Sequence, residues 1–374
     1  MKVSIVTDDG FPAQIARELA RSVPRALDGV DTLNGDAIEV EIESSRRPLP
    51  PTRHGKPALA EWYAAVGTGH DLTIIVSEIP HRRAGRTVLA DVYRDRMLVL
   101  YTPAFGVVGA RRRAREIAHH VLPALARGTM ADLRAAPRHA GWEGPHLDAD
   151  ERHDADDADE GQRVDAPPGT YTLVSRTGLG RLRLLAGMVR SNRPWRLIPT
   201  LSGALGAASA ASAFGIFYAS IWQMASAMSV LRLALVTVVA VCAMALWLIV
   251  PNGLWERSGF RESSRDRAFY NAATVATVVT GVLCMYALLS AAVLAAAAMI
   301  VPTSFFEQQL REPATVVGYV KLAWLAASLG TVAGAVGSST SDRSEILRAT
   351  YGQRELDRRR AVEREQERQE DEGS

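Results

Sequence analysis

The stretch LRLALVTVVAVCAMALWLIV, Leu231–Val250, contains a single charged residue, Arg232. A lipid bilayer has an apolar core about 30 Å thick, and a helix of roughly 20 apolar residues crosses it. Three further stretches have the same character: Leu197–Ala219, Ala272–Val301 and Val317–Ser338. Together they predict an all-α transmembrane region of four helices within residues 197–340.

The loops between these stretches differ in arginine content. Loop 251–270 has four Arg, whereas loop 221–230 has no charge and loop 302–316 has one Arg. Short loops rich in Arg or Lys remain on the cytoplasmic side of a membrane. We therefore expect a multi-pass protein of the inner membrane with both termini in the cytoplasm, the second of them as a charged tail, 341–374.

The segment 170–196 lies just before the first predicted span. It contains several Arg and neither Asp nor Glu. Arg side chains alternate with Leu over 178–195, which predicts an amphipathic helix on the anionic inner leaflet. The residues expected to contact the bilayer and its anionic lipid headgroups are Arg181, Arg183, Arg190, Arg193 and Arg196. The alternative is that this segment is the extended start of the first span.

Small residues mark the fourth predicted span. Gly330 and Gly334 form a GxxxG motif, which lets two helix backbones approach closely. We expect this motif to serve packing within the bundle, and a homodimer through the fourth span is the alternative. The predicted spans contain no Asp, Glu or His, which counts against a proton-coupled transporter.

Residues 1–127 alternate between strand-like and helix-like patterns, which predicts a soluble α/β domain. Leu72–Val76 is continuously apolar and is expected at the centre of the sheet, whereas Ala37–Glu43 alternates and is expected near an edge. Thr87–Val92 and Met97–Tyr101 form a hairpin or one crossing strand. The remaining predicted elements are a strand, Val3–Thr7, and helices at Pro12–Val23, Pro57–Val66 and Val107–Leu125.

Ligands of open α/β sheets bind beyond the carboxyl ends of the strands. The residues in that position are Asp8, Asp9 and Gly10 after the first strand, and Glu78, His81 and Arg82 after the central one. The two acids suit a cation or a ribose, and His81 with Arg82 suits a phosphate. Turn and helix-cap chemistry is the alternative explanation for Asp8-Asp9-Gly10.

The chain lacks the short motifs that identify common cofactor sites. It has no GxGxxG, no GxxxxGK[ST], no CxxC and no GxSxG. Its two cysteines lie in apolar stretches, so we expect neither a disulfide nor a metal site from them. The net charge of +2 and the absence of a basic stripe with interleaved aromatics argue against nucleic acid as a partner. No cofactor is predicted.

The stretch RRRAREIAHH, Arg111–His120, is one substitution from the HExxH motif of zinc proteases. Arg115 occupies the position of the first ligand, and a guanidinium does not bind a metal. At about 100° per residue, Glu116 and His119 point about 150° away from the centre of the apolar face. We therefore expect an ordinary exposed helix surface, whose three leading Arg could face anionic lipid or the acidic linker.

The segment 128–169 is expected to be a disordered linker. Its part HLDADERHDADDADE, 146–160, has eight acids and one Arg. So high a density of like charge prevents a segment from burying enough apolar surface to fold.

Three stretches carry a resemblance to a known group of proteins: TDDGFPAQIARELA from Thr7, SEIPHRRAGRTVLADV from Ser77 and YTPAFGVVGARRRAREI from Tyr101. Over residues 1–127 the chain resembles an actinobacterial family of multi-pass membrane proteins. The resemblance implies a cytosolic α/β domain followed by C-terminal spans. It assigns no catalytic residue.

Taken together, these patterns predict a binding or scaffold module, in which a cytoplasmic α/β domain recognises a ligand or a protein at the membrane. One alternative is a membrane-tethered enzyme that acts on a small phosphorylated or anionic substrate with Asp8, Asp9, Glu78 and His81. A second is a transporter or channel component. Whether the domain is catalytic stays open, and the absence of catalytic motifs favours binding.

Overall fold

The computed structural model describes residues 1–8, 10–28, 30, 38–44, 52–53, 56–57, 70–83, 85–93, 96–129, 142–147, 171–175, 179–255 and 264–337. Two compact units are present. The first runs from Met1 to Ser191 and takes in two short later segments, and the second consists of Asn192–Phe260 and Arg267–Leu356. An N-terminal mixed sheet with helices and a helical C-terminal region confirm the predicted α/β plus helical layout.

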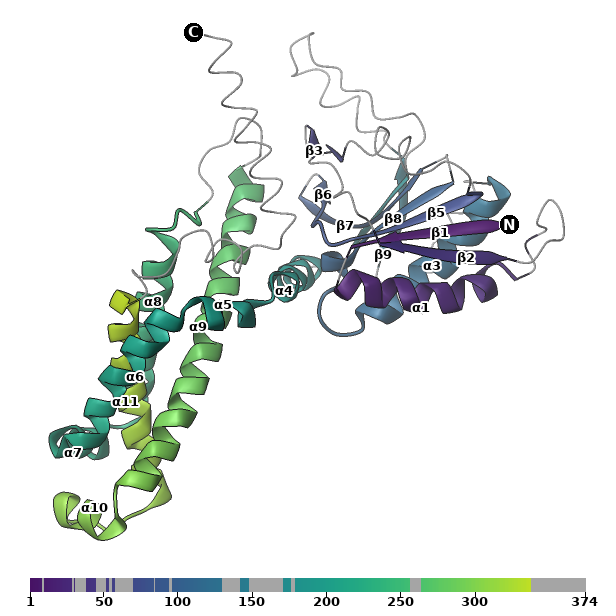
Figure 1. The fold of residues 1–374 in the computed structure, drawn as a ribbon. Helices are drawn as coiled ribbons and strands as arrows, with labels where there is room; N and C mark the ends of the chain where they lie inside the picture. Colours follow the sequence, from purple (N-terminus) through teal and green to yellow (C-terminus); the bar gives the residue numbers. More distant parts are fainter. Residues whose placement is uncertain are drawn as a thin grey trace, which may run out of the picture. The chain divides into compact units, whose positions relative to one another are not determined.

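The first unit is built on one mixed sheet of order β2-β1-β5-β8-β7-β10-β9 (Figure 1). The strands β2 (Glu39–Ser44), β1 (Lys2–Thr7), β5 (Leu72–Ser77) and β8 (Met97–Tyr101) are parallel. The strands β7 (Arg86–Tyr93), β10 (Tyr171–Ser175) and β9 (Trp142–Leu147) continue the sheet in antiparallel pairs. Short pairings add β6 (Arg82–Arg83) to β7, and join β3 (Thr52–Arg53) to β4 (Lys56–Pro57).

Strand position follows the hydrophobic pattern of each strand. All six residues of β5 are buried between β1 and β8, which confirms the central strand predicted from its continuous apolar run. Strand β2 alternates and lies at the edge, as predicted. The β7–β8 pair is an antiparallel hairpin, which decides between the two expected arrangements. Most of the predicted helix 57–66 lies outside the described residues.

Helices α1 (Phe11–Ala26) and α3 (Ala110–Arg127) contact each other and lie on the same face of the sheet (Figure 1). Each presents one apolar face to the strands, with residues such as Ile15 and Leu19 of α1 and Ile117 of α3 fully or almost fully buried. Their opposite faces, rich in Arg, are exposed. A short helix η1 (Thr102–Phe105) joins β8 to the segment before α3.

The first unit extends beyond the domain boundary expected at residue 127. Strand β9 lies inside the segment 128–169, and β10 lies inside the segment 170–196, yet both pair with the domain sheet. Sequence reasoning missed them because acidic residues dominate the segment between the two short strands. Parts of the expected linker, 130–141 and 148–169, lie outside the described residues, as does the expected tail 341–374.

The second unit contains helices α8 (Val230–Ile249), α9 (Ser264–Ile300) and α11 (Val316–Gly337), each long and apolar enough to cross a membrane. The first predicted span is divided between α5 (Leu197–Thr200) and α6 (Ser202–Phe217). The helical stretch Gly180–Thr200 is bent by 61° relative to α6, so the number of candidate spans is three, or four if that pair counts as one. Short helices η4 (Pro194–Arg196), α7 (Ala219–Ala227) and α10 (Thr303–Leu310) complete the unit.

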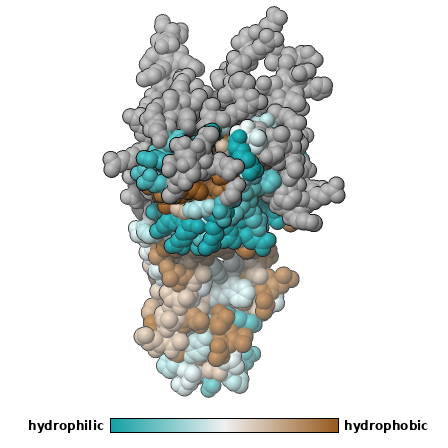
Figure 2. Space-filling model, turned by 90° about the vertical axis from the view of Figure 1, so that its right-hand side faces the viewer, coloured by the Kyte–Doolittle hydropathy of each residue, from teal (hydrophilic) through white to brown (hydrophobic). Residues whose placement is uncertain are grey.

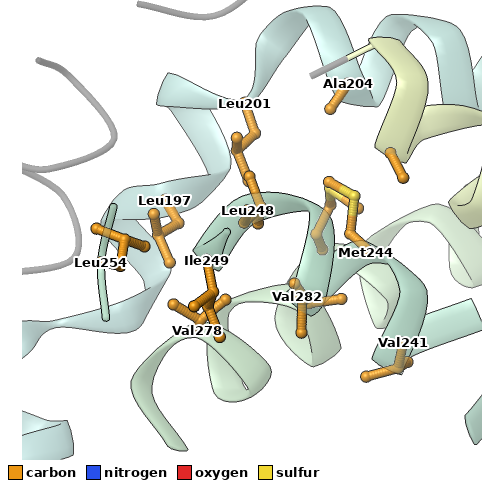
Figure 3. Close-up of a cluster of buried hydrophobic side chains, with 13 residues drawn as sticks. Leu197, Leu201, Ala204, Val241, Met244, Leu248, Ile249, Leu254, Val278 and Val282 are labelled. Atoms are coloured by element: carbon orange, nitrogen blue, oxygen red, sulfur yellow. The ribbon is translucent and has the colours of Figure 1, made fainter. Parts of the chain in front are cut away.

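Apolar side chains lie both inside and outside this helical unit. One buried cluster joins α5, α6, α8 and α9 through residues that include Leu201, Met244 and Val282 (Figure 3). On the outside, Leu231 is 80% exposed and Leu235 is 62% exposed. The surface of the helices is correspondingly apolar over much of the lower part of Figure 2. Because water does not tolerate so much exposed apolar surface, the helices are suited to a membrane.

Glycines of α11 lie directly against α6. A Cβ atom on Gly330 would be 2.0 Å from Ser212 Oγ, and one on Gly334 would be 2.9 Å from the Ala204 carbonyl oxygen. The GxxxG motif therefore packs within the chain. A homodimer through the fourth span stays a prediction, and it would have to use a different face of α11.

Candidate functional site

The carboxyl ends of β1 and β5 meet because the two strands are parallel neighbours. Asp8, which follows β1, is buried, and its Oδ2 accepts a hydrogen bond of 2.9 Å from the Glu78 backbone N–H. The Asp8 N–H donates to the Val76 carbonyl oxygen at 3.3 Å. Asp8 and Glu78 are thus brought together as predicted by the topology, and Asp8 has a clear structural role in joining the two loops.

The residues next to Asp8 form the turn into α1. Gly10 has a φ of 92°, a left-handed conformation that suits glycine, and it precedes the helix without a side-chain cap. Gly10 therefore fits the alternative explanation, in which this stretch forms the turn before a helix. Asp9 lies outside the described residues.

His81 belongs to a second group of side chains. Its Nε2 is 3.8 Å from Asp91 Oδ2, and its ring centre is 5.0 Å from that of Tyr101. The Tyr101 hydroxyl donates to the same Asp91 oxygen at 2.8 Å. Burial, reinforced by the Asp91 charge, raises the pKa of Tyr101 well above its usual value, so this phenol stays protonated. The sequence analysis did not identify Asp91. The available sign was an acidic residue within a mostly apolar strand.

Arg82 supports a tight turn. It is the first residue of β6, and its Nη2 donates to the Gly85 carbonyl oxygen at 3.1 Å, within the turn between β6 and β7. Four of the six residues expected to form one site thus take part in different contacts. Asp8 contacts Glu78, His81 contacts Asp91 and Tyr101, and Arg82 supports a tight turn.

Helix α4 (Gly180–Asn192) packs against η1, which follows β8 at the same carboxyl edge. A Cβ atom on Gly187 would be 1.9 Å from the Pro103 carbonyl oxygen, so only glycine allows this approach. A Cβ on Gly106 would be 3.3 Å from Arg183 Cβ, which shows a second close contact. Leu184 of α4 is completely buried and Met188 is 9% exposed. One face of α4 is therefore part of the domain.

Arg190 extends this contact. Its Cζ lies 3.5 Å from the centre of the Phe11 ring, and its Nη1 donates to the Gly106 carbonyl oxygen at 2.6 Å. Burial lowers the pKa of Arg190 to about 10, against the opposing attraction of Glu78, and the guanidinium stays charged near pH 7. Through this cation–π contact and this hydrogen bond, the Arg190 side chain binds to the α/β domain. The sequence had instead predicted that Arg190 contacts lipid.

The other Arg residues expected at the membrane surface have different environments. Arg181 and Arg196 are exposed, and Arg183 and Arg193 are partly buried. Arg193 has a φ of 49°, which is unusual for a residue with a side chain, and it precedes η4. On the outer face of α4, Leu179 and Leu182 are 55% and 61% exposed. This outer face keeps the mixture of Arg and Leu that motivated the prediction of lipid contact.

Glu41, Glu43 and His70 are the described residues grouped closely enough to hold a metal ion. One ligand atom from each lies within 4.8 Å of the others, and His70 Nε2 is 3.7 Å from Glu43 Oε1. Two carboxylates and an imidazole are donors that suit Zn²⁺ or Mn²⁺. Alternation along β2 places the two Glu on one face, and this was visible in the sequence. Nothing in the sequence indicated that His70, which precedes β5, would lie close to these two Glu residues.

The helical unit contains a hydrogen-bonded cluster of hydroxyl groups between α8, α9 and α11. Oxygen–oxygen distances are 3.2 Å for Thr237–Tyr286, 3.1 Å for Thr237–Ser328 and 3.0 Å for Tyr286–Ser328. The Trp324 Nε1–H donates to Thr237 Oγ1 at 2.6 Å. Such side chains join helices in lipid, where an unpaired polar group is costly.

No protein-family model, no curated protein and no solved structure matches this chain. The resemblance to an actinobacterial membrane-protein family therefore stays a prediction.

Proposed function

We propose that this protein is a membrane-anchored binding module, in which a cytoplasmic α/β domain recognises a ligand or a protein and is fastened to the membrane spans by α4. The observation that carries the proposal is the contact of α4 with the domain at Gly187 and Arg190. A flexible tether would not need a glycine such as Gly187 packed against the Pro103 backbone carbonyl. The packing instead makes the helix that leads to α5 and α6 a structural part of the domain.

Three features support binding rather than catalysis or transport. Asp8 and Arg82 hold loops in place, and His81 lies against Asp91 and Tyr101. The hydroxyl cluster of the helical unit is paired within the bundle, as packing side chains are. The spans contain no acid or His that could carry a proton.

The proposed location is the inner membrane, with both termini in the cytoplasm and α10 on the opposite side. Arg-rich short segments before α5 and between α8 and α9 support this orientation. Reporter fusions test it. Green fluorescent protein after Ser374 should be fluorescent and alkaline phosphatase there inactive, whereas a phosphatase fusion at Glu312 should be active. An active phosphatase after Ser374 would overturn the proposed topology.

Ligand recognition is tested on the full chain in nanodiscs of zwitterionic lipid. Nucleotides, sugar phosphates and dicarboxylates are added separately, and hydrogen–deuterium exchange of the α/β domain is measured. A ligand that slows exchange in the domain without being consumed supports the binding module. Turnover of a bound ligand would favour the enzyme instead, and no protection by any compound would overturn the small-ligand form of the proposal.

A further inference from the structure

A groove lies between α1 and α3, on the side of these helices that faces away from the sheet. Its hollow has a volume of about 520 Å³. The side chains that matter for its chemistry are Glu18, Arg21 and Arg25 of α1 and Arg115, Glu116 and His119 of α3. The groove is therefore formed by the same stretch that resembles a zinc-protease motif, together with the second half of α1.

Three Arg and two Glu line this groove, and further Arg side chains surround it on both helices. Arg17, Arg21 and Arg25 recur every four residues of α1 and are all exposed, so they form one stripe along the helix. Like charges at this spacing repel one another on a helix. On α3, Arg111, Arg112 and Arg115 are also exposed. A bound anion would relieve the repulsion between these charges.

The two acids of the groove are already engaged. Arg115 Nη1 lies 3.3 Å from Glu18 Oε1, and Arg112 Nε lies 2.6 Å from Glu116 Oε1. Within the described part of the chain, Arg21 and Arg25 make no ion pair with an acid. Two guanidinium groups therefore border the hollow without a carboxylate partner, and Arg115 holds the opposite wall close to α1.

His119 lines the groove together with Arg25 and Arg115. Its pKa is lowered, first by partial burial and then by the charges of Arg115 and Arg25. The imidazole is therefore neutral near pH 7 and can donate one hydrogen bond. An anion placed between the guanidinium groups would oppose their effect and raise the pKa of His119.

The shape of the site favours a soluble ligand. A volume of about 520 Å³ falls within the range of roughly 300–1,000 Å³ that is typical of small-molecule sites. Guanidinium groups match phosphate oxygens in pairs, and several of them around one hollow suit more than one phosphate.

We propose that the α1–α3 groove binds a soluble molecule with a diphosphate or triphosphate group, held by Arg21, Arg25 and Arg115 and hydrogen-bonded by His119. This inference rests on the proposed binding function and names the chemistry of its ligand. It also assigns recognition to a surface other than the strand ends, where α4 packs against η1.

The test uses the full chain in nanodiscs of zwitterionic lipid, at low salt, with inorganic pyrophosphate and tripolyphosphate as probes. Isothermal titration calorimetry measures their affinity for the wild-type protein and for Arg21→Gln/Arg25→Gln. A matched control, Lys2→Gln/Arg86→Gln, removes two exposed charges from the same unit outside the groove. Loss of two charge-assisted contacts should weaken binding by about tenfold or more, and the control should stay within about twofold.

A second readout is the pKa of His119, followed by NMR of the imidazole and assigned with His119→Gln. Pyrophosphate should raise this pKa in the wild-type protein and in the control, but not in Arg21→Gln/Arg25→Gln. Equal affinities in the two double variants, or no change of the His119 pKa on binding, would overturn the groove as the site.

The arms of the experiment separate this inference from the proposed function. Phosphate binding that depends on Arg190 rather than on Arg21 and Arg25 would overturn the groove and leave the binding module intact. Failure of both probes to bind, with association of the protein to anionic vesicles that depends on Arg21 and Arg25, would assign the groove to a lipid headgroup and overturn the soluble ligand. The attachment of α4 is measured independently of any ligand.

Discussion

Gly187 and Gly330 each allow a close contact between elements, and the two contacts lie in different environments. Gly187 of α4 brings a helix against η1 in the α/β unit, and Gly330 of α11 brings a helix against α6 in the apolar unit. Around Gly187, the buried Leu184 and the half-buried Arg190 add apolar burial and a cation–π contact. Around Gly330, the neighbours are small residues such as Ala208 and Ser212.

The difference follows from the surrounding solvent. In water, burial of apolar side chains such as Leu184 stabilises a contact by about 25 cal/mol for each Å² removed from water. In lipid that contribution is absent, because lipid tails are as apolar as the side chains, and close packing of small residues takes its place. The same residue type therefore supports a contact driven by apolar burial in one unit and by van der Waals contact in the other.

The largest expected effect comes from comparing two leucines. Leu98→Ala removes a fully buried side chain from the sheet core and should destabilise the α/β unit by about 2–5 kcal/mol. Leu235→Ala removes a side chain that is 62% exposed on α8, and it should change stability by about 0.5 kcal/mol. Chemical denaturation in detergent, followed for each unit separately, measures both. Similar losses would contradict the assignment of the α8 surface to lipid.

A smaller effect is expected for Gly330→Ala. The added Cβ would meet Ser212 Oγ at 2.0 Å and the Ala208 carbonyl oxygen at 2.5 Å, so α6 and α11 must separate. Overpacking of this kind costs about 1–3 kcal/mol. Gly206→Ala is the matched control, because a Cβ there would meet nothing within 4 Å. The melting temperature in detergent should fall for the first variant and be unchanged or slightly higher for the second. Equal values would mean that α6 and α11 do not pack through this glycine.

The smallest effect is a pH dependence from His119. Its pKa is lowered in the folded protein, so the unfolded chain binds a proton at higher pH than the folded one does. The folded state is therefore favoured above the unfolded His pKa near 6.5 and loses that advantage as pH falls through the lowered pKa. Denaturation between pH 7.5 and 5 should show a small loss of stability that His119→Gln reduces. A steeper pH dependence in the variant would contradict the sign of the shift.

Periodicity predicted much of the fold, and long-range contacts decided the rest. The continuous apolar run of β5 and the alternation of β2 are local properties, and they indicated the centre and the edge of the sheet. The pairing of β10 with β7 is not local, since about 80 residues separate them, and the acids between β9 and β10 conceal two short strands.

Strand order predicted one contact among the candidate site residues, and other contacts depend on tertiary packing. Parallel neighbours bring Asp8 and Glu78 together, and that follows from strand order. The position of Arg190 depends on α4 lying against Pro103, and no pattern of charges distinguishes such a helix from one that lies on a membrane. Gly187 was the available signal, because a glycine within an otherwise amphipathic helix indicates close approach of another backbone.

The central claim is that α4 is a structural part of the α/β domain, and hydrogen–deuterium exchange of Gly187→Ala in the full chain tests it most directly. Alanine favours a helix over glycine, so α4 itself should persist, whereas its Cβ would meet the Pro103 carbonyl oxygen at 1.9 Å. We expect exchange at the Ala104, Phe105 and Gly106 amides to rise about tenfold or more, with no change in Gly206→Ala. Unchanged exchange of these amides in Gly187→Ala would contradict the attachment of α4 to the domain.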